Sequence, residues 1–418
     1  MLRVLYLSPS VNQMSVGEAY VAYKWAEALS EKVKLTILTF KPVDTEHARL
    51  LEALPNVELV TWPTPNYPKS LSRFVAMFKP TYPLYKARVR RWLREAQAEG
   101  REFDLAHQIM PQAARYSSPL TGSGVPYIIG PLGGALSTPE AFSEEDAASA
   151  SWFMSFRKLD SIRFRHDPWL RRTYSEAAMI LGVAPYVQEV LADIPLKRFE
   201  VVLELGVDAL PPLPPARPQD GGLRLLHVGR GVRTKGLRDV VRAMAALKDL
   251  PDLTLISAGS GPEIDICKAE AEQLGVADRI TFEGQVPRAR VEELYQQSDM
   301  FVFPSFREPA GNVLYEAMRN GLPLIAADRG GPAFIVDDTL GIKIPVTSPD
   351  EYARDIAAAI RALYNDPERR AALGQGARAK LEREGFWETK AEHLVSLYEQ
   401  VAGASVEDAS HTSELHKG

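Results

Sequence analysis

The chain has 418 residues, of which 45% are hydrophobic and 25% are charged, and its formal net charge is −5. This length is typical of two domains, the charge is not that of a nucleic-acid binder, and no apolar run is long enough to predict a membrane-spanning helix. The single cysteine, Cys267, excludes an intramolecular disulfide, and the N-terminal residues lack the pattern of a secretory signal. We therefore expect a cytoplasmic protein.

The first half alternates predicted strands and helices, which is typical of a parallel sheet covered by helices. A continuous apolar run predicts the first strand at 2–8, and the spacing of apolar residues predicts a helix at 17–31. Further strands are predicted at 33–39, 57–61, 103–107, 126–129, 179–182 and 200–203.

The proline-rich segment 208–222 cannot form a helix or a central strand, and it predicts a linker between domains. After it the alternation restarts, with strands predicted at 223–228, 253–258, 279–282, 299–302 and 322–326 and helices at 350–364, 367–383 and 387–401. The sequence thus predicts an α/β fold of two Rossmann-like parallel-sheet domains facing a cleft. The expected boundaries are a first domain at 1–207, a second at 223–385, a helix at 386–402 that packs back on the first domain, and a disordered tail at 403–418.

Two glutamates flank a predicted helix start after the strand at 299–302. Glu308 lies in the loop, and Gly311 and Asn312 open the helix, with Asn312 expected as its cap. The free amides of a helix N-terminus bind anions, and a diphosphate is the obvious one here. Glu316 follows eight residues after Glu308, so both carboxylates can reach the hydroxyls of one extended ligand. Alternatively, Glu308 only stabilises the helix end and Glu316 is a solvated surface residue.

A second loop, after the strand at 223–228, contains Gly229-Arg230 and then Lys235-Gly236. Glycine lets the backbone approach a phosphate, and the two cations neutralise it. The alternative is an exposed basic turn. The loop at 258–263 lacks the third glycine of a dinucleotide fingerprint, so a nicotinamide cofactor is poorly supported.

These motifs together resemble glycosyltransferase family 4, a retaining family with the GT-B fold. The resemblance covers about half the chain, in family order, and includes Glu316-Ala317-Met318, Gly321-Leu322-Pro323 and Gly330-Gly331-Pro332. It implies donor binding by Arg230, Lys235, Glu308, Gly311, Asn312 and Glu316, with Val286 near the nucleobase and Gly17 from the first domain. The chain departs from the family pattern at Ala310 and Phe334, which leaves the donor sugar open.

The resemblance makes the first domain the acceptor-binding domain and the second the donor-binding domain. Gly17-Glu18 resembles the family's N-terminal glycine loop, and the loop that ends in Gly133 and Gly134 resembles one found in a subset of the family. The alternative is two tight turns. His107 ends the strand at 103–107, where the family has a histidine near the donor sugar, so it is either catalytic or a core histidine. His227 lies within an apolar strand and is expected to be structural.

The sequence therefore predicts a transferase that moves a glycosyl group from a nucleoside-diphosphate sugar to an acceptor hydroxyl, with retained configuration. Glu308, His107, Arg230 and Lys235 are the candidate catalytic residues. No DxD motif follows a strand, so neither a metal nor another cofactor is expected. The alternatives are an epimerase or phosphorolytic enzyme of the same fold and a non-catalytic nucleotide-sugar binding protein.

Two basic segments lie in the first half. Residues 69–94 carry eight basic residues and no acidic one among large apolar residues, and residues 157–172 carry six basic residues against two acidic. Such segments predict reversible binding to an anionic membrane surface, at the inner membrane face, beside a lipid-linked or membrane-proximal acceptor. Alternatively, residues 69–94 form an amphipathic helix that packs on the sheet and keeps its arginines in solvent.

Overall fold

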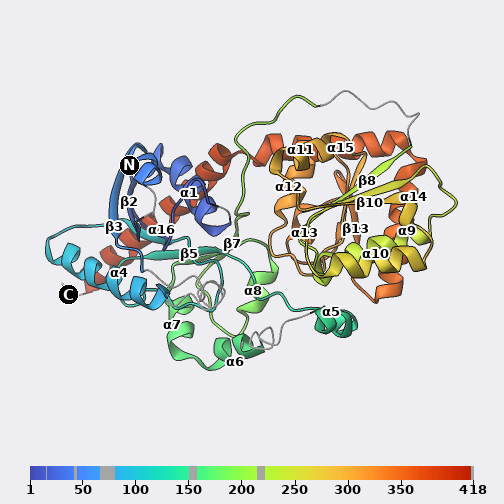
Figure 1. The fold of residues 1–418 in the computed structure, drawn as a ribbon. Helices are drawn as coiled ribbons and strands as arrows, with labels where there is room; N and C mark the ends of the chain where they lie inside the picture. Colours follow the sequence, from blue (N-terminus) through green and yellow to red (C-terminus); the bar gives the residue numbers. More distant parts are fainter. Residues whose placement is uncertain (16, 42–44, 66–80, 150–157, 214–221, 416–418) are drawn as a thin grey trace. The chain divides into compact units, whose positions relative to one another are not determined.

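The computed structural model describes residues 1–415, except for residue 16 and residues 42–44, 66–80, 150–157 and 214–221. The chain divides into two compact units, each described here by itself (Figure 1). Unit 1 comprises Met1–Ala135, Arg157–Leu205 and Trp387–Gly418, and unit 2 comprises Leu136–Phe156 and Gly206–Phe386. The segment 136–156 thus belongs to unit 2, although the sequence places it inside the first domain.

Unit 1 is built on a seven-stranded sheet in the order β3-β2-β1-β4-β5-β6-β7, and all of its pairings are parallel. Its strands are β1 (Arg3–Leu7), β2 (Lys34–Phe40), β3 (Val57–Trp62), β4 (Leu105–Gln108), β5 (Tyr127–Leu132), β6 (Met179–Gly182) and β7 (Phe199–Val201). Its helices are α1 (Glu18–Ser30), α2 (Thr45–Glu52), α4 (Thr81–Ala98), α6 (Lys158–His166), α7 (Pro168–Glu176), α8 (Tyr186–Val190) and α16 (Trp387–Leu415). Strand order reverses between β1 and β4, so the loops after these strands open at the usual ligand edge of such a sheet.

The last helix of the chain completes the core of unit 1. α16 packs beside α1 (Figure 1), where the rings of Trp25 and Trp387 meet edge to face with centroids 5.4 Å apart. Trp25 also donates its indole N–H to the Glu204 carbonyl at 3.0 Å. The helix continues to Leu415, beyond the expected start of a disordered tail at 403.

Unit 2 is built on a six-stranded parallel sheet in the order β10-β9-β8-β11-β12-β13. Its strands are β8 (Arg224–Val228), β9 (Thr254–Ala258), β10 (Ile280–Gly284), β11 (Met300–Phe303), β12 (Leu324–Ala327) and β13 (Gly341–Ile344). Its helices are α5 (Ser143–Ser149), α9 (Leu237–Ala245), α10 (Glu263–Gln273), α11 (Arg288–Gln296), α12 (Asn312–Arg319), α13 (Gly330–Ile335), α14 (Pro349–Asn365) and α15 (Pro367–Glu384), with 3₁₀ turns η2 (Glu140–Phe142), η5 (Arg233–Lys235) and η6 (Ala277–Arg279). Here strand order reverses between β8 and β11. The expected pair of parallel-sheet domains is therefore confirmed.

Several helices begin where a polar residue precedes a proline. Ser348 accepts a hydrogen bond from the Glu351 amide at 3.4 Å at the start of α14, and Asp366 accepts one from the Arg369 amide at 2.8 Å at the start of α15. In both helices proline holds the first position, where its missing N–H costs nothing. These starts could be predicted because cap and proline stand side by side in the sequence.

The described part of the first basic segment is the helix α4. Its buried residues recur every three or four positions and face the sheet: Tyr82, Tyr85, Val89, Leu93 and Ala96. The apolar side of α4 is thus used inside unit 1, as the amphipathic-helix alternative predicts, while residues 66–80 lie outside the described residues. Among the residues that the structure describes, no helix is long and apolar enough to cross a membrane.

Candidate functional site

Two loops meet where the strand order of unit 2 reverses. The loop after β8 carries Arg230 and Lys235, and the loop after β11 carries Glu308 and leads into α12. Because β8 and β11 are parallel neighbours, their loops open at the same edge of the sheet. This arrangement brings together the two motifs that the sequence separates by about seventy residues.

The centre of the site is a contact between the Lys235 ammonium and the Glu308 carboxylate. The Lys235 Nζ donates to Glu308 Oε2, and both side chains are 13% exposed. The other Glu308 oxygen, Oε1, accepts from the Gly311 amide at 3.3 Å. Lys235 Nζ also lies 5.3 Å from the centroid of the Phe303 ring, a cation–π contact. A cation, a carboxylate and a helix N-terminus therefore meet at one point.

The start of α12 presents backbone amides to this point. Gly311 precedes the helix with φ of 92°, a left-handed conformation that favours glycine, and Asn312 is the first helical residue. The expectation that Asn312 caps the helix is wrong by one position, because Gly311 holds the cap and no side chain bonds to it. The first-turn amides have no partner within a helix and carry its positive dipole end, so they attract an anion.

Backbone carbonyls of the β8 loop are held by neighbouring side chains. Ser305 Oγ donates to the Thr234 carbonyl at 2.9 Å, and His227 Nε2 lies 3.0 Å from the Lys235 carbonyl. A carbonyl only accepts, so His227 carries its proton on Nε2 and is neutral. Burial lowers the pKa of His227 to about 4. His227, which the sequence predicts to be structural, thus holds the backbone of Lys235 in place.

Glycines of the β9 loop pack against the β8 loop. A Cβ on Gly259 would lie 1.8 Å from the Gly229 carbonyl oxygen, and one on Gly261 would lie 2.3 Å from that of Gly231. The Gly231 amide donates to the Ser260 carbonyl at 2.8 Å. The glycines of the incomplete fingerprint therefore allow the β9 loop to pack closely on the β8 loop. The sequence pattern alone does not distinguish glycines with this role from glycines that contact a ligand.

The Gly330-Gly331 pair shapes the Glu308 loop from the other side. The Gly331 amide donates to the Glu308 carbonyl at 2.9 Å. A Cβ on Gly331 would lie 2.4 Å from the Ala310 carbonyl oxygen, and one on Gly330 would lie 2.4 Å from that of Glu308. Both positions therefore require glycine so that α13 can approach this loop.

Glu316 lies on α12, about one turn after Asn312. It is half-buried on α12 and accepts from the Tyr295 hydroxyl at 3.1 Å, and burial raises the pKa of its carboxyl. Tyr295 belongs to α11, which starts directly after Val286-Pro287. The contact of Glu316 with Tyr295 thus connects α12 with α11, the helix that follows Val286. Arg230, the other candidate cation, is exposed in the β8 loop.

The candidate residues of unit 1 lie at the corresponding edge of its own sheet. Gly17 precedes α1 with φ of 68°, and Glu18 is the first residue of that helix. The Gly133 amide donates to the Gln112 carbonyl at 3.0 Å, and the Gly134 carbonyl accepts from the Tyr186 hydroxyl at 3.2 Å. These loops follow β1 and β5, as the sequence predicts.

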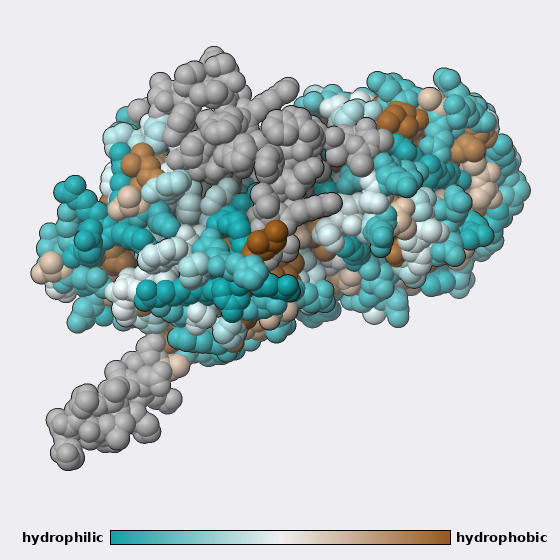
Figure 2. All heavy atoms as spheres, turned by 90° about the horizontal axis from the view of Figure 1, so that it is seen from below, coloured by the Kyte–Doolittle hydropathy of each residue, from teal (hydrophilic) through white to brown (hydrophobic). Residues whose placement is uncertain are grey.

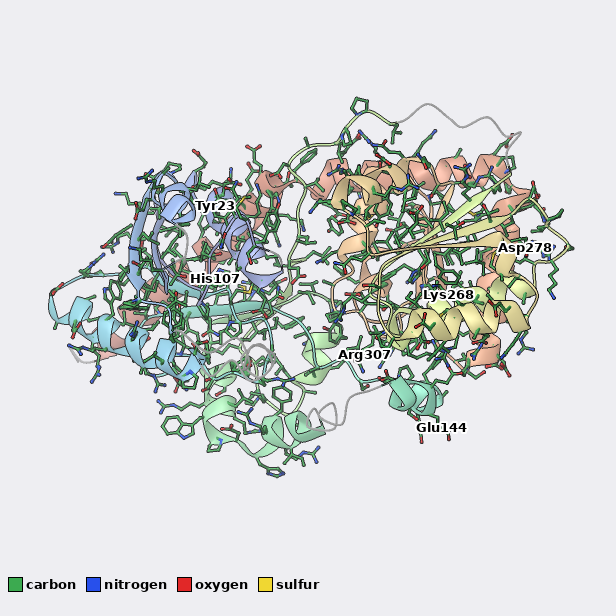
Figure 3. All side chains as sticks on the ribbon, in the orientation of Figure 1. Tyr23, His107, Glu144, Lys268, Asp278 and Arg307 are labelled. Atoms are coloured by element: carbon green, nitrogen blue, oxygen red, sulfur yellow. The ribbon has the colours of Figure 1, made fainter. Side chains whose placement is uncertain are left out.

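His107 has the surroundings of a core residue. It is fully buried in unit 1 (Figure 3), with Nε2 2.6 Å from the Gly130 carbonyl and Nδ1 2.6 Å from the Tyr398 hydroxyl. The carbonyl requires a proton on Nε2, so Nδ1 accepts from Tyr398 and neither nitrogen is open to a substrate. Burial lowers the pKa of His107 to about 4, although the Gly130 contact opposes this shift. These contacts favour the alternative of a core histidine over a catalytic role.

Part of the second unit is similar in sequence to a known protein family. Residues 215–380 match the family of glycosyl transferases group 1. The chain is 30% identical over 200 residues to the glycogen synthase of Mycobacterium tuberculosis, which is 47% of each chain. It is 35% identical over 193 residues to the D-inositol 3-phosphate glycosyltransferase of Corynebacterium glutamicum, which is 44% of this chain and 45% of that one. The match thus spans about half the length of these curated relatives.

Solved structures share the fold over nearly the whole chain. Anabaena HepE in complex with UDP and glucose has a TM-score of 0.60 at 18% identity, covering 95% of this chain and 99% of that one. WaaG, a glycosyltransferase involved in lipopolysaccharide biosynthesis, has a TM-score of 0.55 at 17% identity, covering 96% and 100%. At these identities the likeness shows the fold, which is that of GT-B glycosyltransferases. The group 1 region contains Arg230, Lys235, Glu308 and Glu316.

Proposed function

We propose that the protein transfers a sugar from a nucleoside-diphosphate sugar to an acceptor hydroxyl. The observation that carries this proposal is the contact of Lys235 with Glu308 beside the α12 N-terminus, within the region that matches the group 1 family. Lys235 and the free amides supply positive charge for a diphosphate, and Glu308 supplies an acceptor for sugar hydroxyls. The UDP and glucose bound to HepE support this class of donor.

The chemistry follows from where charge develops. As the glycosidic bond to the diphosphate breaks, negative charge grows on the leaving phosphate, and Arg230, Lys235 and the α12 dipole would stabilise it. We propose retention of configuration, with the leaving phosphate oxygen taking the acceptor proton on the same face of the sugar. Because the leaving phosphate takes the acceptor proton, this mechanism needs no carboxylate or histidine as a separate base. It is therefore compatible with the full burial of His107.

The decisive experiment is a thermal-shift screen of the full chain against UDP-, GDP- and ADP-sugars, because a ligand that binds the folded state raises its melting temperature. The stabilising donor is then incubated with candidate acceptors, and NMR of the product reports the anomeric configuration. Turnover should persist in EDTA, because the proposed charge stabilisation uses side chains and amides. Stabilisation by none of the donors would contradict the proposal.

Turnover also separates the alternatives. An epimerase would convert the donor without an acceptor, a phosphorolytic enzyme would require free phosphate, and a binding protein would be stabilised without any turnover. The contact of Glu308 with Lys235 is compatible with both a transferase and a nucleotide-sugar binding protein, so turnover is the measurement that separates them.

We also propose electrostatic attachment to an anionic membrane surface at the inner membrane face, with a carbohydrate or lipid-linked acceptor. Arg91 and Arg94 are exposed on α4, and α6 and α7 expose Ile162 and Trp169 among basic residues. On the face in Figure 2, outside the grey atoms, hydrophobic residues are scattered rather than gathered in a broad patch. The apolar side of α4 is buried, so charge rather than insertion of this helix would dominate such an attachment.

A further inference from the structure

A short segment that connects β5 with α6 in the sequence belongs to unit 2. Residues 136–149 contain η2 and α5, and they contact the two loops that carry Lys235 and Glu308 and the loop that leads into α13. We call this segment the clamp. The sequence indicates no role for it, because α5 is short and acidic, with Glu144, Glu145 and Asp146 in its first turn.

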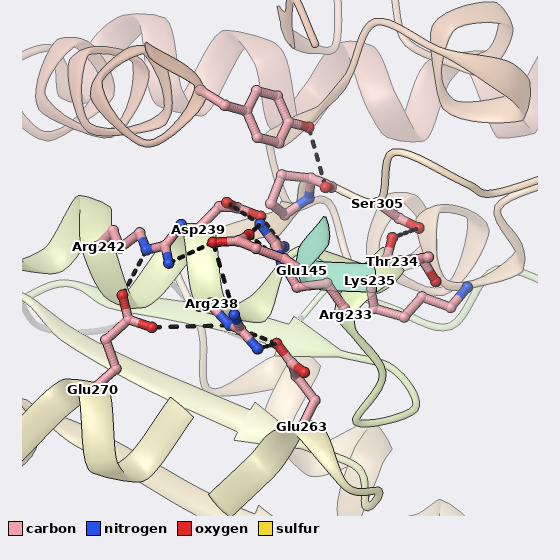
Figure 4. Close-up of polar contacts among 12 residues, drawn as sticks. Glu145, Arg233, Thr234, Lys235, Arg238, Asp239, Arg242, Glu263, Glu270 and Ser305 are labelled. Carbon is pink, nitrogen blue, oxygen red and sulfur yellow. Dashed lines mark hydrogen bonds and ion pairs between the residues drawn. The ribbon is translucent and has the colours of Figure 1, made fainter. Parts of the chain in front are cut away.

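The clamp contacts the β8 loop through Glu145 (Figure 4). Glu145 Oε2 accepts from Arg233 Nε at 2.7 Å, and Oε1 accepts from Arg242 Nη2 at 2.9 Å. Arg233 is fully buried and also donates to both oxygens of Asp239, at 2.6 and 2.8 Å. Burial alone would raise the pKa of Glu145, but the charges of Arg233 and Arg242 outweigh it and hold the pKa below its usual value. Glu145 is thus an ionised partner of a buried guanidinium.

Phe142 anchors the clamp in the core. Its ring lies 4.5 Å from that of Phe306 and meets that of Tyr352 edge to face at 5.7 Å. The Arg233 guanidinium lies within cation–π distance of both phenylalanines, 5.3 Å from the Phe142 centroid and 5.2 Å from that of Phe306. Phe142 is fully buried and belongs to the same core cluster as the sheet of unit 2. Since such a core is close-packed, the clamp is part of the unit and not a loose loop.

The clamp also contacts the other two loops. Arg307, in the Glu308 loop, donates to Thr138 Oγ1 at 2.8 Å and to Asp146 Oδ2 at 3.1 Å. Arg329, at the start of α13, donates to the Ser137 carbonyl and to the Phe306 carbonyl, both at 2.6 Å. One short segment therefore binds the neighbours of Lys235, Glu308 and Gly330.

We propose that the clamp positions the donor-binding loops and that Glu145 is a positioning residue, acting through Arg233 on Lys235. This inference rests on the proposed function. Arg233 and Lys235 share the single 3₁₀ turn η5, so a shift of the Arg233 side chain moves the backbone that carries Lys235. Removing the Glu145 charge leaves the buried Arg233 guanidinium with Asp239 as its remaining charged partner, so the Arg233 side chain and the turn that carries it are held less firmly.

The test compares Glu145→Gln with Glu144→Gln in the full chain. Glu144 is the neighbouring residue on α5, is exposed, and points away from the other elements of unit 2 (Figure 3), so its variant matches the charge change. The first measurement is hydrogen–deuterium exchange of peptides covering 229–236 and 305–311. The second is the affinity for UDP, GDP and ADP, together with the donor KM and kcat for the donor that supports turnover.

We expect faster exchange at 229–236 in Glu145→Gln and a rise of roughly tenfold in the nucleotide Kd and donor KM, with a smaller change in kcat. Glu144→Gln should match the parent in every measurement. A folded Glu145→Gln variant with parent-like exchange at 229–236, or with parent-like nucleotide affinity, would overturn the proposal.

Two further outcomes are distinguishable. If the parent binds none of the three nucleotides, the proposed function fails, and parent-like exchange in Glu145→Gln would then reject the clamp separately. If Glu145→Gln does not fold, Asp146→Asn tests the same idea through Arg307. This variant should speed exchange at 305–311 and weaken nucleotide binding, and parent-like behaviour in both would overturn the proposal.

Discussion

At the scale of single residues, Lys235 and Glu308 neutralise each other in the structure. A diphosphate that binds Lys235 must therefore compete with the carboxylate, and the same step frees Glu308 to accept hydrogen bonds from a sugar. Under the proposed function, this exchange of partners would couple donor binding to the release of Glu308. The partial exposure of both side chains is compatible with such a role.

We predict that Lys235→Ala lowers kcat/KM by an amount equal to about 2–4 kcal/mol of transition-state stabilisation, because a desolvated charge contact is lost. Glu308→Gln should lower turnover more than it lowers the melting temperature. The matched control is Lys268→Ala, an exposed lysine of α10 in the same unit (Figure 3), which should behave as the parent. Parent-like rates in both Lys235→Ala and Glu308→Gln would place the site elsewhere.

The second residue-scale prediction concerns the pH dependence of stability. The pKa of His107 falls from 6.5 to about 4 on folding, so below pH 6.5 the unfolded chain binds a proton that the folded chain does not. The stability contribution is present above pH 6.5 and is lost as the pH falls towards 4, by at most about 3 kcal/mol.

Urea unfolding of the parent and of His107→Gln at pH 7, 6 and 5 measures this effect. The difference in unfolding free energy between the two proteins should shrink as the pH falls, because glutamine does not titrate. The ratio of turnover to folded protein should stay near the parent value. A constant stability difference across the pH range would contradict the lowered pKa of His107, and a loss of turnover without loss of stability would support a catalytic role.

At the scale of elements, sequence patterns predict structure where the signal is local. α14 and α15 start at polar residues followed by proline, and strands with continuous apolar runs, such as β6, match their expected bounds. β13 was not predicted because Gly341–Ile344 begins with glycine and contains a lysine, so it has no continuous apolar run. The role of His107 could not be decided from the sequence, since its partner Tyr398 lies 291 residues away.

In the candidate site, too, the residues of local motifs could be predicted and those that depend on distant contacts could not. Lys235, Glu308 and Gly311 were predicted because their motifs are compact, and the structure brings them together. The clamp was not predicted, because an acidic helix next to a single phenylalanine carries no sign of burial. The partner of Glu145 is Arg233, an arginine 88 residues further along the chain.

The element-scale prediction concerns α4. Its apolar side is buried, so any membrane attachment depends on exposed arginines and should disappear at high salt. We expect the protein to float with anionic but not neutral vesicles at low salt, and the double variant Arg91→Glu, Arg94→Glu to lose this binding. The control exchanges Arg369 and Arg383 on α15, which are also exposed. An absence of flotation with anionic vesicles would leave a soluble acceptor as the default.

At the scale of the whole molecule, each unit has its own core, but neither is a continuous stretch of chain. α16 supplies Trp387 and Tyr398 to the core of unit 1, and the clamp supplies Phe142 to the core of unit 2. The two units should therefore respond differently when the chain is shortened from its C-terminal end.

We predict that a chain ending at Phe386 loses the stability of unit 1 and keeps that of unit 2. Removal of a buried tryptophan alone typically costs about 3–5 kcal/mol, and here a whole packed helix is lost. Calorimetry should show one transition near its parent temperature, still raised by the nucleotide that the parent binds. A single transition shifted as a whole would show that the units unfold together.

The same arrangement sets the order in which a newly made chain can fold. The ribosome releases residues 136–149 long before the sheet of unit 2 exists, so Phe142 must wait in solvent until β8 to β12 have been synthesised. The sheet of unit 1 emerges early, yet its tryptophan contact forms only after Trp387 has left the exit tunnel. Both cores thus close late in synthesis, and the nascent chain must keep two sets of apolar side chains from premature association.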